Sequence, residues 1–345
     1  MRNSIDNLRR ERTLPRETMR ELLLCDDPDI LAYLFEQARS VREQVYGKKV
    51  FIRGLVEFTN YCKNDCLYCG IRRSNGRAQR YRLSEGQILP CAAAGYALGF
   101  RTIVLQGGED PYFTDERLVS IVRALKQAHP DCAVTLSVGE RSPDSYRALR
   151  EAGADRYLLR HETANETHYR ALHPPELSYR ARMECLRHLK SLGFQTGCGF
   201  MVGSPGQTVE HLLEDLAFIS SFQPQMVGIG PFIPHKDTPF GDRPAGSVAM
   251  TVKLLAIIRL LLPHVLLPAT TALATLDPYG CEKGILAGAN VVMPNLSPQD
   301  VRNKYLLYNN KASFGSEAAE SLDLLQMRMN KIGYQVVTER GDYRS

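Results

Sequence analysis

The chain has 345 residues, of which 44% are hydrophobic and 23% charged, and this composition excludes an intrinsically disordered protein. Its formal net charge of +5 is too small to indicate a nucleic-acid binder. No apolar run is long enough to predict a membrane span, and residues 1–20 lack the apolar stretch of a signal peptide. We therefore expect a cytoplasmic protein, in which nine cysteines indicate a metal or redox role rather than a disulfide framework.

Residues 1–48 are predicted to form an N-terminal helical extension, because apolar residues recur at helical spacing in 17–24 and 30–46. Residues 49–310 then alternate short β-rich runs with longer helical stretches. The expected strands are 50–58, 102–105, 133–138, 156–160, 195–202, 226–229, 265–269 and 290–293. The expected helices are 84–98, 115–127, 143–151, 178–192, 208–222, 250–262 and a short one near 280–287.

Eight βα repeats over about 250 residues predict an α/β fold, a complete (β/α)8 TIM-type barrel, rather than a doubly wound sheet of fewer strands. Residues 311–345 are predicted to form a C-terminal helical segment, with a helix from residue 316 and a polar tail that packs across one end of the barrel. In such barrels the active face lies at the carboxyl ends of the strands.

Three cysteines follow the first predicted strand, in the pattern C-x3-C-x2-C: Cys62, Cys66 and Cys69. Three thiolates in one loop can hold a soft metal centre. A structural zinc would need a fourth ligand, but no Cys or His follows until Cys91 in the next helical stretch. Three ligands and one open position suit a [4Fe–4S] cluster whose fourth iron binds a substrate.

With Tyr68 directly before the last cysteine, this loop resembles the signature of the radical S-adenosylmethionine (SAM) superfamily. The resemblance implies two cofactors, one [4Fe–4S] cluster and SAM, whose amine and carboxylate bind the open iron. Tyr68 then belongs to the SAM site. The segment Gly107-Gly108-Glu109, after the second strand, resembles the family's Gly-Gly-Glu segment, whose backbone and carboxylate bind the SAM ammonium.

Two further strand ends add polar side chains. Alternation along a strand places Thr135 and Ser137 on one face, and it places Arg160 and Glu162 together at the end of the fourth strand. Resemblance assigns Ser137 and Glu162 to the ribose or the amino-acid end of SAM. Thr135, on the same face as Ser137, is expected in the same cofactor site.

Arg182, on the following helix, is assigned by the same resemblance to the SAM carboxylate. Ordinary polarity of a barrel layer remains the alternative for Thr135 and Ser137. A solvated helix face remains the alternative for Arg182, because Arg180 and Arg187 compete for its role.

Several runs outside the SAM contacts resemble the HydE-type [FeFe]-hydrogenase maturases, over roughly residues 50–308; they are 68–73, 80–83, 105–112, 156–165, 201–208, 226–234 and 268–274. This resemblance implies reductive cleavage of SAM to methionine and a 5′-deoxyadenosyl radical. The radical acts on a sulfur-containing substrate, a cysteine-bound iron carbonyl cyanide unit, during assembly of the hydrogenase H-cluster. Other maturases and an electron donor such as flavodoxin or ferredoxin are the implied partners.

A substrate cavity that faces an anion is expected from cationic and polar residues at the strands, together with one methionine: Arg53, Glu57, Gln106, Arg160, Thr270, Thr271 and Met293. Some members of the family carry a second cluster near the C-terminus. Residues 311–325 contain no cysteine, so we expect one cluster only. The other six cysteines are expected to be small buried hydrophobes, although Cys198 near the end of the fifth strand could face the lumen.

Three alternatives remain open. A methylornithine-synthase-like radical SAM mutase would share the barrel and the cysteine spacing, but it would convert lysine. A structural zinc protein would contain neither iron nor sulfide. A nucleic-acid module could use the arginines around Tyr81 to bind phosphates, and these are Arg72, Arg73, Arg77, Arg80 and Arg82. We expect neither a nucleic acid nor a membrane as partner.

Overall fold

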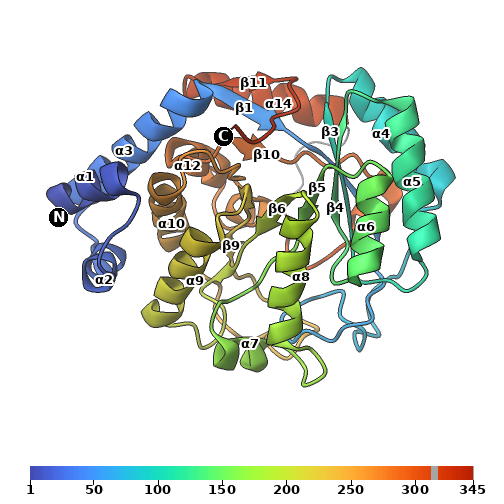
Figure 1. Cartoon of the computed structure of the whole chain (residues 1–345), viewed down its shortest axis with the longest axis horizontal. Helices are drawn as coiled ribbons and strands as arrows, with labels where there is room; N and C mark the ends of the chain where they lie inside the picture. The colour runs from blue at the N-terminus through green and yellow to red at the C-terminus, as the bar shows by residue number, and fades with distance from the viewer. Residues whose placement is uncertain (312–317, 345) are drawn as a thin grey trace.

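A computed structural model describes residues 1–311 and 318–344 (Figure 1). The N-terminal extension forms three helices, α1 (Arg2–Glu11), α2 (Arg16–Leu24) and α3 (Pro28–Tyr46). α3 begins where the Asp27 carboxylate accepts the N–H groups of Asp29 and Ile30, at 2.9 and 3.2 Å. It packs against α10 (Val248–Leu261), so the extension covers one side of the barrel.

Six parallel strands form the main sheet, in the order β2-β3-β4-β5-β6-β8. They are β2 (Gly54–Thr59), β3 (Thr102–Gly107), β4 (Ala133–Ser137), β5 (Arg156–Leu158), β6 (Gln195–Cys198) and β8 (Met226–Val227). Their pairing follows the chain order, as parallel strands linked by helices require.

Backbone hydrogen bonds continue the pairing beyond β8. The Val227 N–H donates to the Leu266 carbonyl at 3.1 Å, and the Ala269 N–H donates to the Val291 carbonyl at 2.9 Å. β10 (Val291–Val292) then pairs in parallel with β1 (Lys49–Ile52), which leads through Arg53 into β2. The paired segments therefore return to the first strand, as the predicted TIM-type barrel requires.

Three of the expected strands are not formed as predicted, because two are divided and one forms no regular strand. The expected strand 50–58 is divided at the buried Arg53 into β1 and β2. The expected strand 195–202 is divided into β6 and β7 (Met201–Val202) at Gly199, whose φ is +156° and whose Cβ would overlap the Gly228 carbonyl. Residues 265–269 form isolated bridges rather than a strand, and Pro268 there has no N–H to donate.

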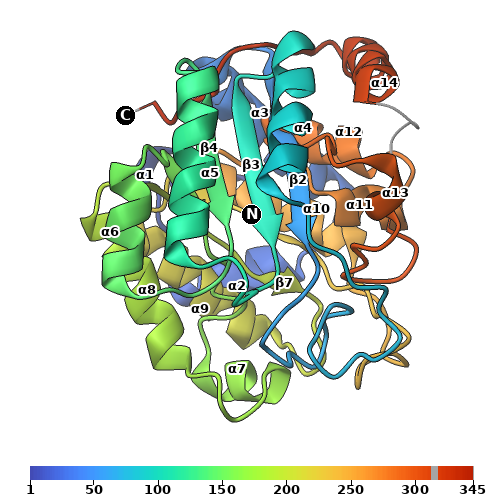
Figure 2. The same cartoon turned by 90° about the vertical axis from the view of Figure 1, so that its right-hand side faces the viewer.

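Helices cover the outside of the strands (Figures 1 and 2). The expected ones are α4 (Glu85–Ala97), α5 (Asp115–Ala128), α6 (Pro143–Glu151), α8 (Tyr179–Ser191), α9 (Val209–Phe222), α10 and α12 (Gly280–Leu286). Short helices that the sequence did not indicate are α7 (Glu166–Leu172), α11 (Thr271–Leu276) and α13 (Gln299–Arg302); β9 (Gly230–Pro231) pairs with β7. Across residues 1–311 and 318–344, no helix is both long and apolar enough to cross a membrane.

The C-terminal part contains α14 (Ala318–Lys331) and a strand that we did not expect, β11 (Gln335–Val337), which pairs in parallel with β1. The start of the predicted helix, at 316, lies outside the described residues. The tail beyond β11 packs at the amino ends of the strands, where Arg156 donates to the Arg340 carbonyl at 3.0 Å and to Asp342 at 2.6 Å. In Figure 2 this end lies opposite the long blue-to-cyan loop that follows β2.

Candidate cluster and cofactor site

The loop between β2 and α4 carries Cys62, Cys66 and Cys69, all three as free thiols. Burial raises the pKa of each thiol, and it raises that of Cys69 to about 12. The charges of Cys69 and Cys62 raise the pKa of Cys66 further. A bound metal centre supplies the positive charge that lets such thiols lose their protons, so this donor set fits a metal cofactor.

The number of thiols distinguishes a cluster from a structural zinc ion. In the described part of the chain, no three His, Cys, Asp or Glu side chains are grouped closely enough to hold one metal ion. A structural zinc needs four such ligands around one point, whereas three thiolates can bind three irons of a [4Fe–4S] cluster and leave the fourth iron open. A loop with three cysteines therefore fits a [4Fe–4S] cluster better than a structural zinc ion.

The end of α7 holds the cysteine loop. The Leu67 N–H donates to the Leu172 carbonyl at 3.0 Å. His173 Nδ1 donates to the Tyr169 carbonyl at 2.8 Å, so Nε2 is free to accept the Tyr68 hydroxyl at 3.1 Å. The Tyr68 ring, expected in the SAM site, is thus fixed by a histidine that the sequence did not indicate.

The arginines of this loop bind the protein itself. Arg72 pairs with Asp65 at 2.7 Å, and Arg82 pairs with Asp110 at 2.7 Å. The exposed side chain of Arg77 pairs with an aspartate at 2.7 Å, and Arg80 donates to backbone carbonyls. Four of the five arginines of the hypothetical phosphate-binding patch thus have internal partners, which weakens the nucleic-acid alternative.

Glycines bring the end of β3 against the cysteine loop. A Cβ on Gly108 would overlap the Tyr61 carbonyl and would lie 2.8 Å from the Cβ of Cys62, so only glycine fits there. The Glu109 carboxylate accepts the Glu140 N–H at 3.0 Å and lies 3.3 Å from the Lys63 ammonium. Glu109 is therefore fixed beside the cysteine loop.

The side chains of Arg160 and Glu162 lie close together, but strand alternation, which we expected to bring them together, is not the cause. β5 ends at Leu158, so strand alternation does not extend to them, and Glu162 has a left-handed backbone with a φ of +66°. Arg160 Nη2 lies 3.3 Å from Glu162 Oε2 without hydrogen-bond geometry, and both atoms are buried without a partner. Unpartnered buried polar atoms are typical of a site that binds a ligand.

Arg182 does not lie on a solvated helix face, and this alternative is wrong. Its side chain is only 8% exposed, it pairs with Glu140 at 2.5 Å, and it donates to the Arg160 carbonyl at 2.7 Å. Both partners adjoin residues expected in the SAM site. The Thr135 hydroxyl is buried without a partner, and Ser137 lies half-buried at the end of β4.

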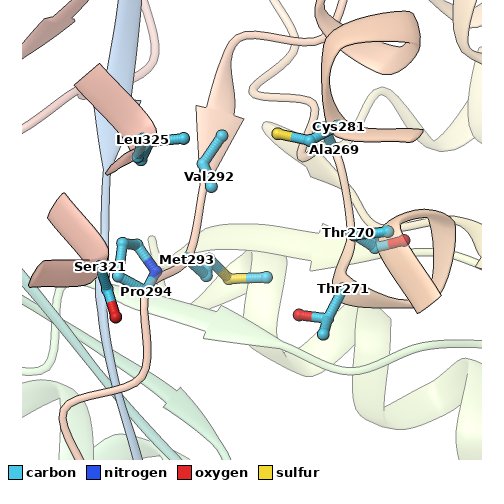
Figure 3. Close-up of a pocket in the computed structure, with 10 residues that line it drawn as sticks. Ala269, Thr270, Thr271, Cys281, Val292, Met293, Pro294, Ser321 and Leu325 are labelled. Carbon is cyan, nitrogen blue, oxygen red and sulfur yellow. The ribbon is translucent and has the colours of Figure 1, made fainter. Parts of the chain in front are cut away.

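Thr270, Thr271 and Met293 line one pocket (Figure 3). The Met293 side chain points toward the two threonines, and the Thr270 hydroxyl is buried without a partner. Ser321 and Leu325 of α14 complete the wall, which the sequence did not indicate.

The other expected cavity residues lie at two different heights along the barrel axis. Arg53 is near the amino ends of the strands, where Nη1 contacts Met226 Sδ at 3.1 Å and Nε and Nη2 lack partners. Burial lowers the pKa of Arg53 well below its usual value, and the charge of Arg156 lowers it further. Glu57 and Gln106 instead lie near Tyr305, to whose hydroxyl the Gln106 amide donates at 3.4 Å.

Residues 304–311 cross the mouth of the barrel, and sequence reasoning missed them. The Gly70 N–H donates to the Leu307 carbonyl at 2.9 Å, and the Asn309 N–H donates to the Pro234 carbonyl at 3.0 Å. The segment thereby joins the cysteine loop to the loop after β9. It also places the ammonium group of Lys311 against the carboxylate of Glu57, and no motif in the sequence predicts this contact.

Comparisons with known proteins agree with this geometry. The model of the radical SAM superfamily matches residues 56–219. The chain is 45% identical over 310 residues to the [FeFe] hydrogenase maturase subunit HydE of Thermotoga maritima, covering 90% of this chain and 88% of that protein. It is 32% identical over 289 residues to the 3-methylornithine synthase of Methanosarcina acetivorans, covering 83% and 81%.

Among solved structures, methylornithine synthase (PylB) superposes with a TM-score of 0.82 at 26% identity, covering 96% of this chain and 97% of that chain. The superposition extends over the barrel and both terminal segments. Sequence identity is higher with HydE than with either synthase. The chain therefore belongs to the radical SAM superfamily and, within it, to the HydE-type family.

Proposed function

We propose that this radical SAM enzyme is an [FeFe]-hydrogenase maturase that acts on a sulfur-containing substrate during assembly of the H-cluster. The observation that carries the proposal is the half-buried three-cysteine loop beside Glu109, in a chain 45% identical to HydE. A bound [4Fe–4S] cluster supplies the electron that cleaves SAM to methionine and a 5′-deoxyadenosyl radical. The residues of this chain hold the cluster, orient SAM and enclose the substrate.

The proposed SAM site uses side chains whose positions are already fixed. The backbone of Gly107 and Gly108 and the carboxylate of Glu109 bind the SAM ammonium, since glycine permits close approach there. Arg182, which is fixed by Glu140, binds the SAM carboxylate and neutralises its negative charge. Tyr68 contributes its buried ring, and the ribose is assigned to a group of polar side chains, Thr135, Ser137 and Glu162.

The proposed substrate is an anion. Arg160 and Thr270 present buried donor atoms without hydrogen-bond partners, and such donors favour negative charge in a site shielded from water. This character suits a cysteine-bound iron carbonyl cyanide unit supplied by a partner maturase. We also propose that a flavodoxin or ferredoxin donates the electron. The proposed location of the protein is the cytoplasm.

Anaerobic reconstitution with iron and sulfide tests the proposal. We expect one reduced-cluster signal in the EPR spectrum of the dithionite-reduced protein, a shift of that signal with SAM, and 5′-deoxyadenosine in the same sample. Cys66→Ser should abolish both the signal and 5′-deoxyadenosine, whereas Cys91→Ser, on α4, should preserve them. If Cys66→Ser changes nothing, the cysteine loop is not the cluster site.

A second candidate is a radical SAM mutase, favoured by the 32% identity to 3-methylornithine synthase and the TM-score of 0.82 with PylB. The two functions differ in their substrate. Incubation of the cluster-loaded protein with lysine, SAM and dithionite should yield no methylornithine, and its formation would overturn the maturase proposal.

A further inference from the structure

Arg80 connects the two ends of the cysteine loop. Its Nη1 donates to the Asn60 carbonyl at 2.5 Å and to the Ile71 carbonyl at 2.8 Å. Its Nη2 donates to the Arg72 carbonyl at 2.6 Å and to the Asn75 carbonyl at 3.2 Å. Asn60 precedes Cys62 by two residues and Ile71 follows Cys69 by two, so one guanidinium joins the segments before and after the three cysteines.

Arg80 differs from most of the cations around the loop because no carboxylate that the structure describes faces it. Six of the others face a carboxylate, in the pairs Lys63–Glu109, Arg72–Asp65, Arg77–Asp237, Arg82–Asp110, Arg160–Glu162 and Arg182–Glu140. Arg73 is exposed to solvent. Among the described residues, Arg80 has no carboxylate within 4.0 Å, and its hydrogen-bond partners are neutral carbonyls. Arg80 therefore places a positive charge beside the cysteines that no adjacent side chain neutralises.

The guanidinium is held at the base of the cysteine loop, because its acceptor carbonyls belong to residues on both sides of the three cysteines. A fixed cation at this position stabilises further negative charge on a cluster that the three thiolates hold.

We propose that Arg80 is a positioning residue for the cluster loop that also raises the reduction potential of the cluster. The inference rests on the proposed radical SAM function. In the step concerned, a one-electron donor reduces the cluster core from 2+ to 1+, and no bond to the protein forms or breaks. The core with its three thiolates thereby passes from one negative charge to two, and the positive charge of Arg80 favours the more negative form.

Three variants of the full chain test this inference: Arg80→Met, Arg80→Lys and Arg73→Met. Arg73 is the matched control, because it lies on the same loop but is exposed. After anaerobic reconstitution, iron and acid-labile sulfide are measured per chain. The midpoint potential is then measured by EPR during a dithionite titration without SAM.

We expect Arg80→Met to shift the midpoint potential to a more negative value and to lower the iron content. Arg80→Lys should keep the potential near that of the wild type, since it keeps the charge, while its iron content falls because an ammonium cannot bridge the four carbonyls. Arg73→Met should change neither value. A purely structural role would change iron content without moving the potential of the clusters that form.

An unchanged potential in iron-loaded Arg80→Met overturns the proposal. If Arg80→Met takes up no iron, Arg80→Lys decides: a wild-type potential in its clusters supports the role of the charge, and a shifted potential or no cluster overturns it. Failure of the proposed function is distinguishable, because the wild-type protein would then form no cluster or no 5′-deoxyadenosine.

Discussion

The ammonium group of Lys311 binds the carboxylate of Glu57, 254 residues earlier in the chain. The Glu57 side chain is 1% exposed, and its second oxygen accepts the Asn295 amide at 2.9 Å. A carboxylate on β2 is thus neutralised by a lysine that follows β10 in the chain. This pair compensates the charge of an acidic side chain buried inside the barrel.

Lys311→Met is therefore expected to lower the free energy of unfolding by about 3–5 kcal/mol, because it leaves the Glu57 carboxylate buried without a cation. Urea unfolding at neutral pH, in anaerobic conditions, measures the effect. The double variant Glu57→Gln/Lys311→Met should recover most of the loss, since no charge then remains unpaired. Equal destabilisation in the single and double variants would show that the lysine acts by packing alone.

Gly139 makes room for Glu109. Its φ is +77°, and a Cβ there would overlap the Glu109 side chain. Gly139→Ala should weaken SAM binding by displacing the carboxylate proposed to bind the SAM ammonium, which equilibrium binding to the cluster-loaded protein measures. Gly193, with a φ of +75° and nothing within 4 Å of the added Cβ, supplies the control.

Gly193→Ala should cost about 1–2 kcal/mol of stability for its left-handed backbone and leave SAM affinity unchanged. An equal loss of affinity in both variants would mean that backbone strain, and not the position of Glu109, controls binding.

His168 makes stability depend on pH. Burial lowers its pKa to about 4, with smaller contributions from His211 and His173. Between a pKa of 6.5 in the unfolded chain and about 4 in the folded protein, the unfolded state binds more protons, so stability falls as the pH falls through this window. At about 1.4 kcal/mol per unit, the loss reaches about 3 kcal/mol.

Urea unfolding of the wild type and of His168→Gln at pH 7 and pH 5 checks this expectation. The difference between the two pH values should be smaller in His168→Gln. The exposed His188 provides the control, because His188→Gln should retain the wild-type difference. If all three proteins respond equally, His168 does not carry the pH dependence.

Local patterns were sufficient to predict much of the molecule. The alternation of strands and helices predicted the barrel, and the pattern of Cys62, Cys66 and Cys69 predicted the radical SAM superfamily. Contacts between distant segments left no such signal. Nothing near Lys311 indicates that its side chain reaches Glu57, and nothing near Glu162 indicates a left-handed backbone, because surrounding packing imposes both.

The division of the first strand at Arg53 also escaped prediction, since the run 50–58 reads as one continuous apolar strand. β11 was missed for another reason. Its three residues are too few to show a period, and its pairing with β1 depends on tertiary contacts.

That pairing sets an order for folding during synthesis. β1 is among the first barrel segments to leave the ribosome, but its neighbour β11 is among the last. Until β11 and Asp342 are synthesised, one edge of β1 lacks its partner, and Arg156, which is fully buried in the folded protein, lacks its carboxylate. A chain that has not reached β11 therefore has an unpaired strand edge and an uncompensated charge, so the first strand is completed only when β11 and Asp342 are present.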